Sequence, residues 1–172
     1  MFQKSGIRLL MVSAAMLAGA SIGSAQVKVA IIDVQRAVFE SAEIKKASAA
    51  MEAKYKPRQT EIDKITKDIQ ALQQQIQSGK LSALGEQDAN AQGQKKQREL
   101  TRLTEDLQAD VDRERNETLS KASERMKEVV KKMAEEKGVD VVIDVTNAFY
   151  FKPALEITTE AIAAYDKAYP AK

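Results

Sequence analysis

Residues 137–145 read KGVDVVIDV, and this stretch decides the fold of the chain. Gly138 ends a long polar pattern that is typical of a helix, and five of the seven residues after it are Val or Ile. Such a run of β-branched residues predicts a β-strand. A single strand is not stable in water, because its backbone donors and acceptors need a partner. The chain must therefore hold a second strand elsewhere.

The partner strand that the sequence offers lies near the start of the chain, in VKVAIID at residues 27–33. Val27, Val29 and Ile31 alternate with less apolar residues, as in a strand with one covered face. Asp33 follows at the position of a helix N-cap, ahead of VQRAVFES. We expect the two distant segments to pair.

Between these strands, residues 40–137 carry two stripes of apolar residues on an otherwise polar and charged background. From Tyr55 onward the spacing alternates between three and four residues, which is the heptad of a coiled coil. The stripes are Ile44, Ala47, Met51, Tyr55, Ile62, Ile65, Ile69, Leu72 and Ile76, then Leu100, Leu103, Leu107, Val111, Leu119, Ala122, Met126, Val129 and Met133. We therefore expect an antiparallel helical hairpin, an arm of roughly 60 Å.

The tip of this arm is expected at residues 77–94, where Gly79, Gly85 and Gly93 break the periodicity. Pro57 falls inside the first stripe, where proline costs on the order of 3 kcal/mol unless the helix kinks or restarts. Two interpretations are open. The kink has no role, or Pro57 is a pivot that lets the arm splay.

The segment after the late strand predicts a hairpin and a final helix. Thr146 and Asn147 suit a tight turn, and AFYF at residues 148–151 suits the returning strand. Thr158 stands at an N-cap position, and the last helix is expected to run to about Tyr169.

The fold class predicted is α+β, with the arm (residues 40–137) inserted between the strands of a small β-rich body made of residues 26–39 and 138–172. A body of fewer than about 50 residues buries too little apolar surface to stand alone. Its strands also leave open edges. We therefore expect an obligate oligomer that is joined through the body. The residues predicted for its interface and core are Val27, Val29, Ile31, Val141, Val142, Ile143, Val145 and Phe149.

Residues 1–25 have the pattern of a signal peptide. Lys4 and Arg8 precede an apolar run at residues 9–22, and small residues lead to a cleavage site after Ala25. The alternative is a membrane anchor, but the run is shorter than the roughly 18–20 residues that a span needs. We expect an exported mature protein without stable membrane insertion.

The composition argues against several functions. The chain has no Cys, His or Trp, so the commonest metal ligand and general base are missing. Lys4 and Arg8 are two of the 27 basic residues, so the mature chain has 25 basic and 25 acidic residues. This neutrality argues against nucleic acid as a partner. Asp33, Asp140 and Asp144 suit a cap and outward strand positions better than a metal site. We expect no enzyme and no cofactor.

The whole layout resembles the Skp/OmpH family of exported bacterial chaperones. The resemblance is carried by the signal peptide, VKVAIIDVQRAVFES, the long charged hairpin, GVDVVIDVTNAFYF and LEITTEAIAAY, in that order. It implies a homotrimer with three arms around a central cavity. It also implies a periplasmic holdase that binds unfolded outer-membrane proteins without ATP and prevents their aggregation.

If the arm binds clients, as the resemblance implies, flexible Met side chains suit adaptable contacts. Met51, Tyr55, Met126 and Met133 lie on the helical stripes and are candidates for client contact, although packing is the better explanation of the three Met residues. Members of this family often have strongly basic tips. Between residues 73 and 98 this chain has a surplus of only two positive charges. The basic residues are Lys80, Lys95, Lys96 and Arg98, and the acidic residues are Glu86 and Asp88. Steering of clients by charge should therefore be weak.

A different class of function stays open. An exported coiled-coil adaptor that docks one folded partner would have a similar hairpin, but it would need a defined patch on the arm. A chaperone needs only a tolerant amphipathic cavity.

Overall fold

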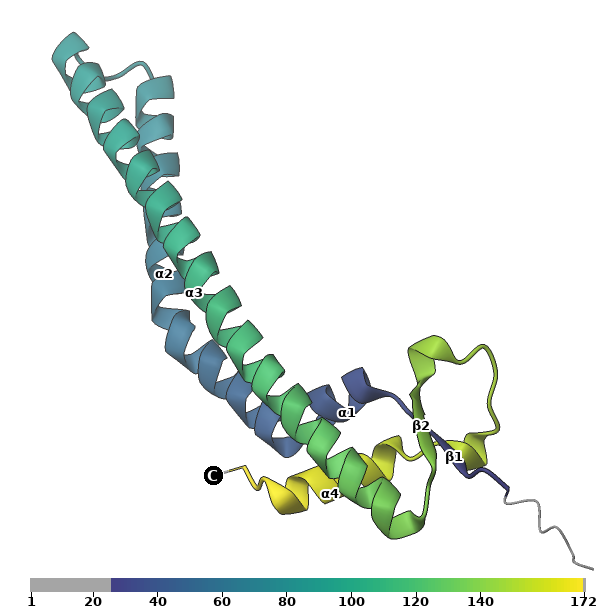
Figure 1. Ribbon diagram of the computed structural model, residues 1–172. Coiled ribbons are helices and arrows are strands. Elements are labelled where there is room, and N and C mark those ends of the chain that lie inside the picture. Colours follow the sequence, from purple (N-terminus) through teal and green to yellow (C-terminus); the bar gives the residue numbers. More distant parts are fainter. Residues whose placement is uncertain (1–25, 172) are drawn as a thin grey trace, which may run out of the picture.

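The structure, a computed structural model, describes residues 26–171. A small body carries a long helical arm (Figure 1). The elements are β1 (Val29–Ile32), α1 (Val34–Glu40), α2 (Ala42–Gln77), α3 (Ala83–Lys137), β2 (Val141–Asp144) and α4 (Thr158–Ala168), with short 3-10 helices at Val145–Asn147 and Pro153–Leu155. The predicted signal peptide, residues 1–25, lies outside the described residues.

The strands β1 and β2 pair as predicted, although the whole arm separates them in the sequence. They are parallel, and Val29 lies opposite Val141. Parallel strands need a crossover connection, and the arm is that connection. At the start of the pair, the backbone N–H of Lys28 donates to the carboxylate of Asp140 over 2.7 Å.

The first three helices each begin at a polar side chain that caps the first turn. Asp33 accepts a hydrogen bond from the backbone N–H of Arg36 over 2.8 Å, which confirms the predicted N-cap of α1. Ser41 and Ser82 cap α2 and α3 in the same way. At its other end α3 stops at Gly138, whose φ of +62° lies in the left-handed region. This cap turns the chain from the arm into β2.

The core lies where the body meets the base of the arm. Side chains from β1, α1, α4 and the adjoining ends of α2 and α3 form one buried cluster. The cluster consists of Ala30, Ile32, Ala37, Val38, Ile44, Ala122, Met126, Val129, Met133, Ile157, Ala161 and Tyr165. Burying a large apolar side chain contributes about 1.5–3 kcal/mol. The arm is therefore anchored by the same apolar core that holds the body together.

Beyond this core, α2 and α3 run side by side and bend together (Figure 1). Their shared seam is buried at Ile62, Ile65 and Ile69 of α2 and at Ala89 and Leu107 of α3. Four of these five are stripe positions of the predicted coiled coil, so the antiparallel hairpin is confirmed. The 55 residues of α3 extend about 80 Å at 1.5 Å per residue.

The predicted hairpin after β2 is wrong. Residues 148–151 form no strand, and the chain leaves β2 through a 3-10 helix at Val145–Asn147. The Asp144 carboxylate holds this turn by accepting hydrogen bonds from the backbone N–H and the hydroxyl of Thr146. Strand formation depends on a neighbour against which the side chains pack. Within the described residues, no third strand is available to pair with this segment.

The turn at the tip is shorter than predicted. α2 ends at Gln77 and α3 begins at Ala83. Of the three glycines, only Gly79 lies in the turn between them, with a φ of +66°. Gly85 and Gly93 lie inside α3. A glycine inside a helix costs only about 1 kcal/mol relative to alanine, which a long packed helix tolerates.

Pro57 lies inside α2, as the sequence predicted, and the helix continues through it without a restart. The start of α4 differs from expectation by one residue. Thr158 is the first residue of α4, and Ile157 occupies the N-cap position. The hydroxyl of Thr158 instead accepts a hydrogen bond from the backbone N–H of Asp33 over 2.9 Å. This bond ties the start of α4 to the end of β1.

Candidate functional site

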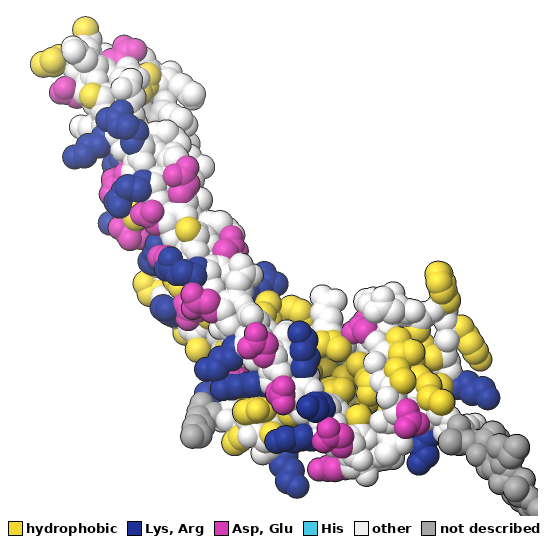
Figure 2. All heavy atoms as spheres, viewed as in Figure 1, with side chains coloured by type: hydrophobic (Ala, Val, Ile, Leu, Met, Phe, Trp, Pro, Cys, Tyr) yellow, Lys and Arg dark blue, Asp and Glu magenta, His cyan; other side chains and the backbone are white. Residues whose placement is uncertain are grey.

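The body presents two aromatic side chains to solvent. Phe149 is 111% exposed and Tyr150 is 83% exposed, both in the segment that follows β2. Figure 2 shows apolar side chains gathered over this end of the molecule. Aromatic side chains typically bury about 150–250 Å² each when they pack. The single chain therefore leaves much apolar surface of its body uncovered.

The other residues predicted for the interface and core fall into three groups. Val27 and Val141 are exposed, at 62% and 44%. Ile31 is buried and belongs to the core of the single chain. The half-buried group consists of Val29, Val142, Ile143 and Val145. The outer edge of β2 carries no further strand among the described residues, so this edge is open to pairing.

An apolar cleft of about 320 Å³ opens beside β2, between the sheet and α3. Ile32, Val34, Val130 and Val142 contribute apolar side chains to its wall. Lys127, Lys131 and Asp144 add charges to the lining. This cleft and the exposed aromatic pair belong to the same body.

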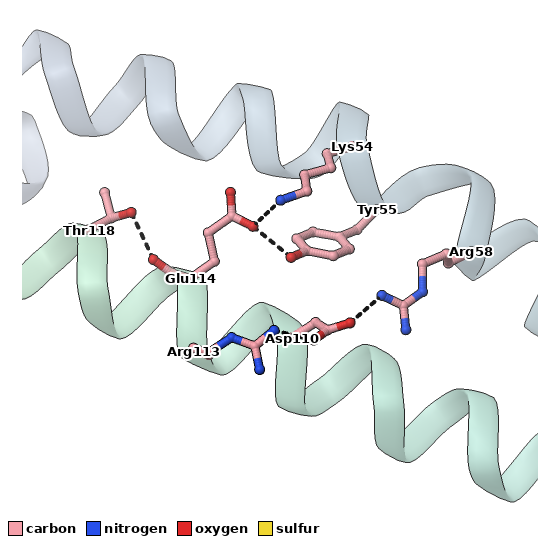
Figure 3. Close-up of polar contacts among 7 residues, drawn as sticks. All are labelled: Lys54, Tyr55, Arg58, Asp110, Arg113, Glu114 and Thr118. Atoms are coloured by element: carbon pink, nitrogen blue, oxygen red, sulfur yellow. Dashed lines mark hydrogen bonds and ion pairs between the residues drawn. The ribbon is translucent and has the colours of Figure 1, made fainter.

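A layer of charged and polar side chains crosses the arm between its base and its middle (Figure 3). We call Lys54, Tyr55, Arg58, Asp110 and Glu114 the polar layer. The ammonium of Lys54 and the hydroxyl of Tyr55 both donate to the Glu114 carboxylate over 2.6 Å. The guanidinium of Arg58 donates to Asp110 over 2.7 Å. Every one of these bonds joins α2 to α3.

The polar layer keeps its carboxylates charged. Hydrogen bonds from Lys54 and then Tyr55 hold the pKa of Glu114 below its ordinary value. Hydrogen bonds from Arg58 and then Arg113 do the same to the pKa of Asp110. Pro57 lies within this layer in the sequence, and it cannot donate a backbone hydrogen bond. The layer therefore joins α2 to α3 close to the turn of α2 where the backbone ladder is incomplete.

A second polar cluster locks the base of the arm to the body. The carboxylate of Glu43 in α2 accepts a hydrogen bond from Arg125 in α3 and another from the hydroxyl of Tyr165 in α4, each over 2.6 Å. Arg125 also lies 4.7 Å from the centre of the Tyr169 ring. Burial raises the pKa of Glu43, but the hydrogen bonds from Tyr165 and Arg125 outweigh it and lower the pKa overall. Three helices thus meet at one carboxylate.

The predicted client-contact residues lie in different environments. Met126 and Met133 are 0% and 7% exposed and form part of the core, so in this state they have almost no surface for a client. Tyr55 belongs to the polar layer and is half-buried. Met51 is half-buried and lines a groove on the arm.

The tip carries its predicted cations and two leucines that sequence analysis missed. Lys80, Lys95 and Arg98 are exposed. Lys96 is half-buried and donates to Asp68 across the hairpin over 2.7 Å, so it fastens α3 to α2. Leu81 and Leu84 are 37% and 69% exposed at the turn. The sequence feature that could have revealed these two leucines is an apolar pair within an otherwise polar turn.

The three aspartates considered for a metal site have other roles. Asp33 caps α1, Asp140 accepts from Lys28, and Asp144 accepts from Thr146. In the described part of the chain, no three acidic side chains come close enough to hold a metal ion. A search of residues 26–171 also finds no helix that is both long and apolar enough to span a bilayer.

Comparison with known proteins connects this geometry to a family. The family model described as outer membrane protein (OmpH-like) matches residues 28–165, which includes both strands and the whole arm. The chain belongs to this family. The resemblance to Skp/OmpH chaperones that the sequence suggested is thereby confirmed.

Relatives of this OmpH-like chain include named chaperones. The chaperone protein Skp of Yersinia enterocolitica is 29% identical over 150 residues, which cover 86% of this chain and 90% of the relative. A Skp-like protein of Pseudomonas aeruginosa is 24% identical over 157 residues, covering 90% of this chain and 93% of the relative. These relatives place the chain in a family of chaperones and not in a class of enzymes.

A solved structure has the same fold. The crystal structure of an OmpH-like protein from Caulobacter crescentus CB15, described as a candidate outer membrane chaperone, superimposes with a TM-score of 0.69. The match covers 87% of this chain and 90% of the other at 18% sequence identity. The fold of paired terminal strands and a helical hairpin arm is therefore shared.

Proposed function

We propose that this protein is an ATP-independent holdase chaperone of the periplasm, which binds unfolded outer-membrane proteins and prevents their aggregation in transit. One observation carries the proposal: a body too small to cover its own apolar surface supports an arm that is long and exposed. Membership of the Skp/OmpH chaperone family supports it. The signal peptide predicted at residues 1–25, with cleavage after Ala25, supports export to that compartment.

The working unit in this proposal is a homotrimer joined through the body. The exposed side chains of Phe149, Tyr150, Val27 and Val141 and the cleft beside β2 become covered by neighbouring copies. Association in a closed ring also removes the open edge of β2. The three arms then surround a cavity, and bending near Pro57 adjusts its width.

Holding a client requires no single tight site. A barrel protein in transit exposes strands that alternate apolar and polar residues and aggregate readily in water. Arms with a mixed apolar and charged surface offer many weak contacts, and these sum through avidity. Release then needs no nucleotide, because each contact is individually weak.

An aggregation assay tests this function. An unfolded outer-membrane barrel protein is diluted from denaturant with and without the mature protein, and light scattering is recorded. We expect near-complete suppression at about one trimer per client. Scattering that is unchanged at this ratio would show that the protein is not a holdase.

Affinity capture from a periplasmic extract separates this function from that of a coiled-coil adaptor. Many different barrel proteins in substoichiometric amounts agree with a holdase. One folded partner captured in fixed proportion would favour the adaptor.

A further inference from the structure

A groove of about 200 Å³ opens on the arm next to the polar layer, between α2 and α3 and beside the end of α1. We call it the arm-base groove. Most of its wall is apolar, and three polar side chains complete it. The lining residues are Phe39, Ile44, Ala47, Ser48, Met51, Arg115, Thr118 and Leu119.

The size of the arm-base groove fits one side chain. A cavity of about 150 Å³ lined by apolar residues is large enough to bind benzene. A stable interface with a folded partner instead buries about 800 Å² on each side, far more than this groove offers. The wall can also adapt, because Phe39 is 40% exposed and Met51 has a flexible thioether. The groove therefore suits a single bulky apolar side chain of variable shape.

The charge at the arm-base groove is unbalanced. The neighbouring Arg113 and Glu114 are both engaged, in ion pairs with Asp110 and Lys54. Arg115 has no carboxylate within ion-pair distance among residues 26–171. A ligand that carries an acidic group beside its apolar side chain would complement this guanidinium.

We propose that the arm-base groove is a receptor for unfolded polypeptide. It takes one large apolar side chain, with aromatic rings fitting best, and Arg115 pairs with an acidic residue next to it in the client. This inference rests on the proposed holdase function and names a site within it. One such site binds weakly, and the copies in an oligomer add their contributions through avidity.

The test measures binding of a labelled, unstructured peptide to the full mature protein by fluorescence anisotropy. The probe peptide contains one Phe followed by Glu. Two matched peptides replace the Phe by Ser or the Glu by Gln. We expect the Ser peptide to bind at least about tenfold more weakly, because the apolar contact is lost. The Gln peptide should bind about threefold more weakly, as for an exposed ion pair.

Two variants locate the site. Ala47→Phe fills the groove, and we expect affinity for the probe to fall about tenfold. Ala71→Phe adds the same ring at an exposed position of α2 outside the groove and should leave the affinity within about twofold. Arg115→Gln should weaken the Glu peptide about threefold and leave the Gln peptide unchanged, whereas Arg98→Gln should affect neither.

Equal binding of the probe to Ala47→Phe and to the wild type would overturn the proposal. So would an Arg115→Gln effect that is the same for both peptides. Should Ala47→Phe lose its helical circular dichroism, the Arg115 comparison decides, because Gln at an exposed position keeps the helix. The holdase function is judged separately: a wild type that suppresses aggregation while Ala47→Phe binds the probe normally refutes the groove alone.

Discussion

At the scale of single residues, the fold depends on side chains that join elements far apart in the sequence. Tyr165 is the clearest case, because it is fully buried and its hydroxyl reaches the Glu43 carboxylate 122 positions away. Burial and then this hydrogen bond raise the pKa of Tyr165, so the hydroxyl stays a donor throughout the physiological range. Its contact connects the body to the arm.

We predict that Tyr165→Phe lowers the free energy of unfolding by about 2 kcal/mol. The ring keeps its packing, but a hydrogen bond to a charged group is lost inside the protein. The measurement is urea unfolding at fixed protein concentration. Tyr169→Phe is the matched control, since the Tyr169 hydroxyl has no hydrogen bond among residues 26–171, and it should change the value by less than about 0.5 kcal/mol. Equal effects of both variants would contradict the role given to Tyr165.

Two glycines, one inside α3 and one at its C-cap, should respond oppositely to alanine. Gly138 has a φ of +62°, where a Cβ is strained, so Gly138→Ala should destabilise by about 1–2 kcal/mol. At Gly93 a Cβ would meet nothing within 4 Å, so Gly93→Ala should stabilise by about 0.5–1 kcal/mol. Thermal unfolding of both variants checks the pair. A stabilised Gly138→Ala would show that the C-cap is not left-handed in solution.

At the scale of elements, the polar layer sets how the arm responds to acid. Asp110 and Glu114 have pKa values below their ordinary 3.8 and 4.5 in the folded protein. Their contribution to stability is therefore complete above these ordinary values and is lost as the pH falls through the lower, folded pKa values. Glu43, Asp68 and Asp144 are shifted in the same direction, so the whole protein loses stability in the same range.

A double variant isolates the contribution of the polar layer. Asp110→Asn with Glu114→Gln should be less stable than the wild type at about pH 7, and the gap should narrow as the pH falls below about 4. Thermal unfolding followed by circular dichroism at several pH values measures this gap. The remaining carboxylates titrate in both proteins and cancel in the comparison. A gap that stays constant with pH would mean that these carboxylates are not ionised partners of Lys54 and Arg58.

The elements also show what can be predicted from sequence. Both strands were predicted because β-branched runs stand beside an N-cap at Asp33 and a C-cap at Gly138, and these are local signals. The segment 148–151 was wrongly predicted as a strand, because its β-propensity counts only when a neighbouring strand is present. The polar cluster at Glu43 could not be predicted either, because Arg125 and Tyr165 come from two other helices and no local sequence pattern links them.

At the scale of the whole molecule, a small body anchors a long arm and leaves part of its own apolar surface exposed. The arm is a long hairpin (Figure 1). In α2 the buried apolar residues are interrupted between Ile44 and Ile62, where the polar layer lies. The body must anchor this arm, yet among residues 26–171 it exposes Phe149 and Tyr150 and leaves the outer edge of β2 unpaired. The proposed association of copies through the body would cover the aromatic pair and would bring several arms around one space.

The mass of the mature protein in native solution tests this account most directly. Sedimentation equilibrium at low micromolar concentration, with cleavage after Ala25 verified by mass spectrometry of the denatured chain, gives the number of copies. We predict a mass of three chains, and we expect Phe149→Ser to shift the species toward unfolded monomer because the aromatic contact is lost. A wild-type chain that is monomeric and fully folded under these conditions would contradict the account.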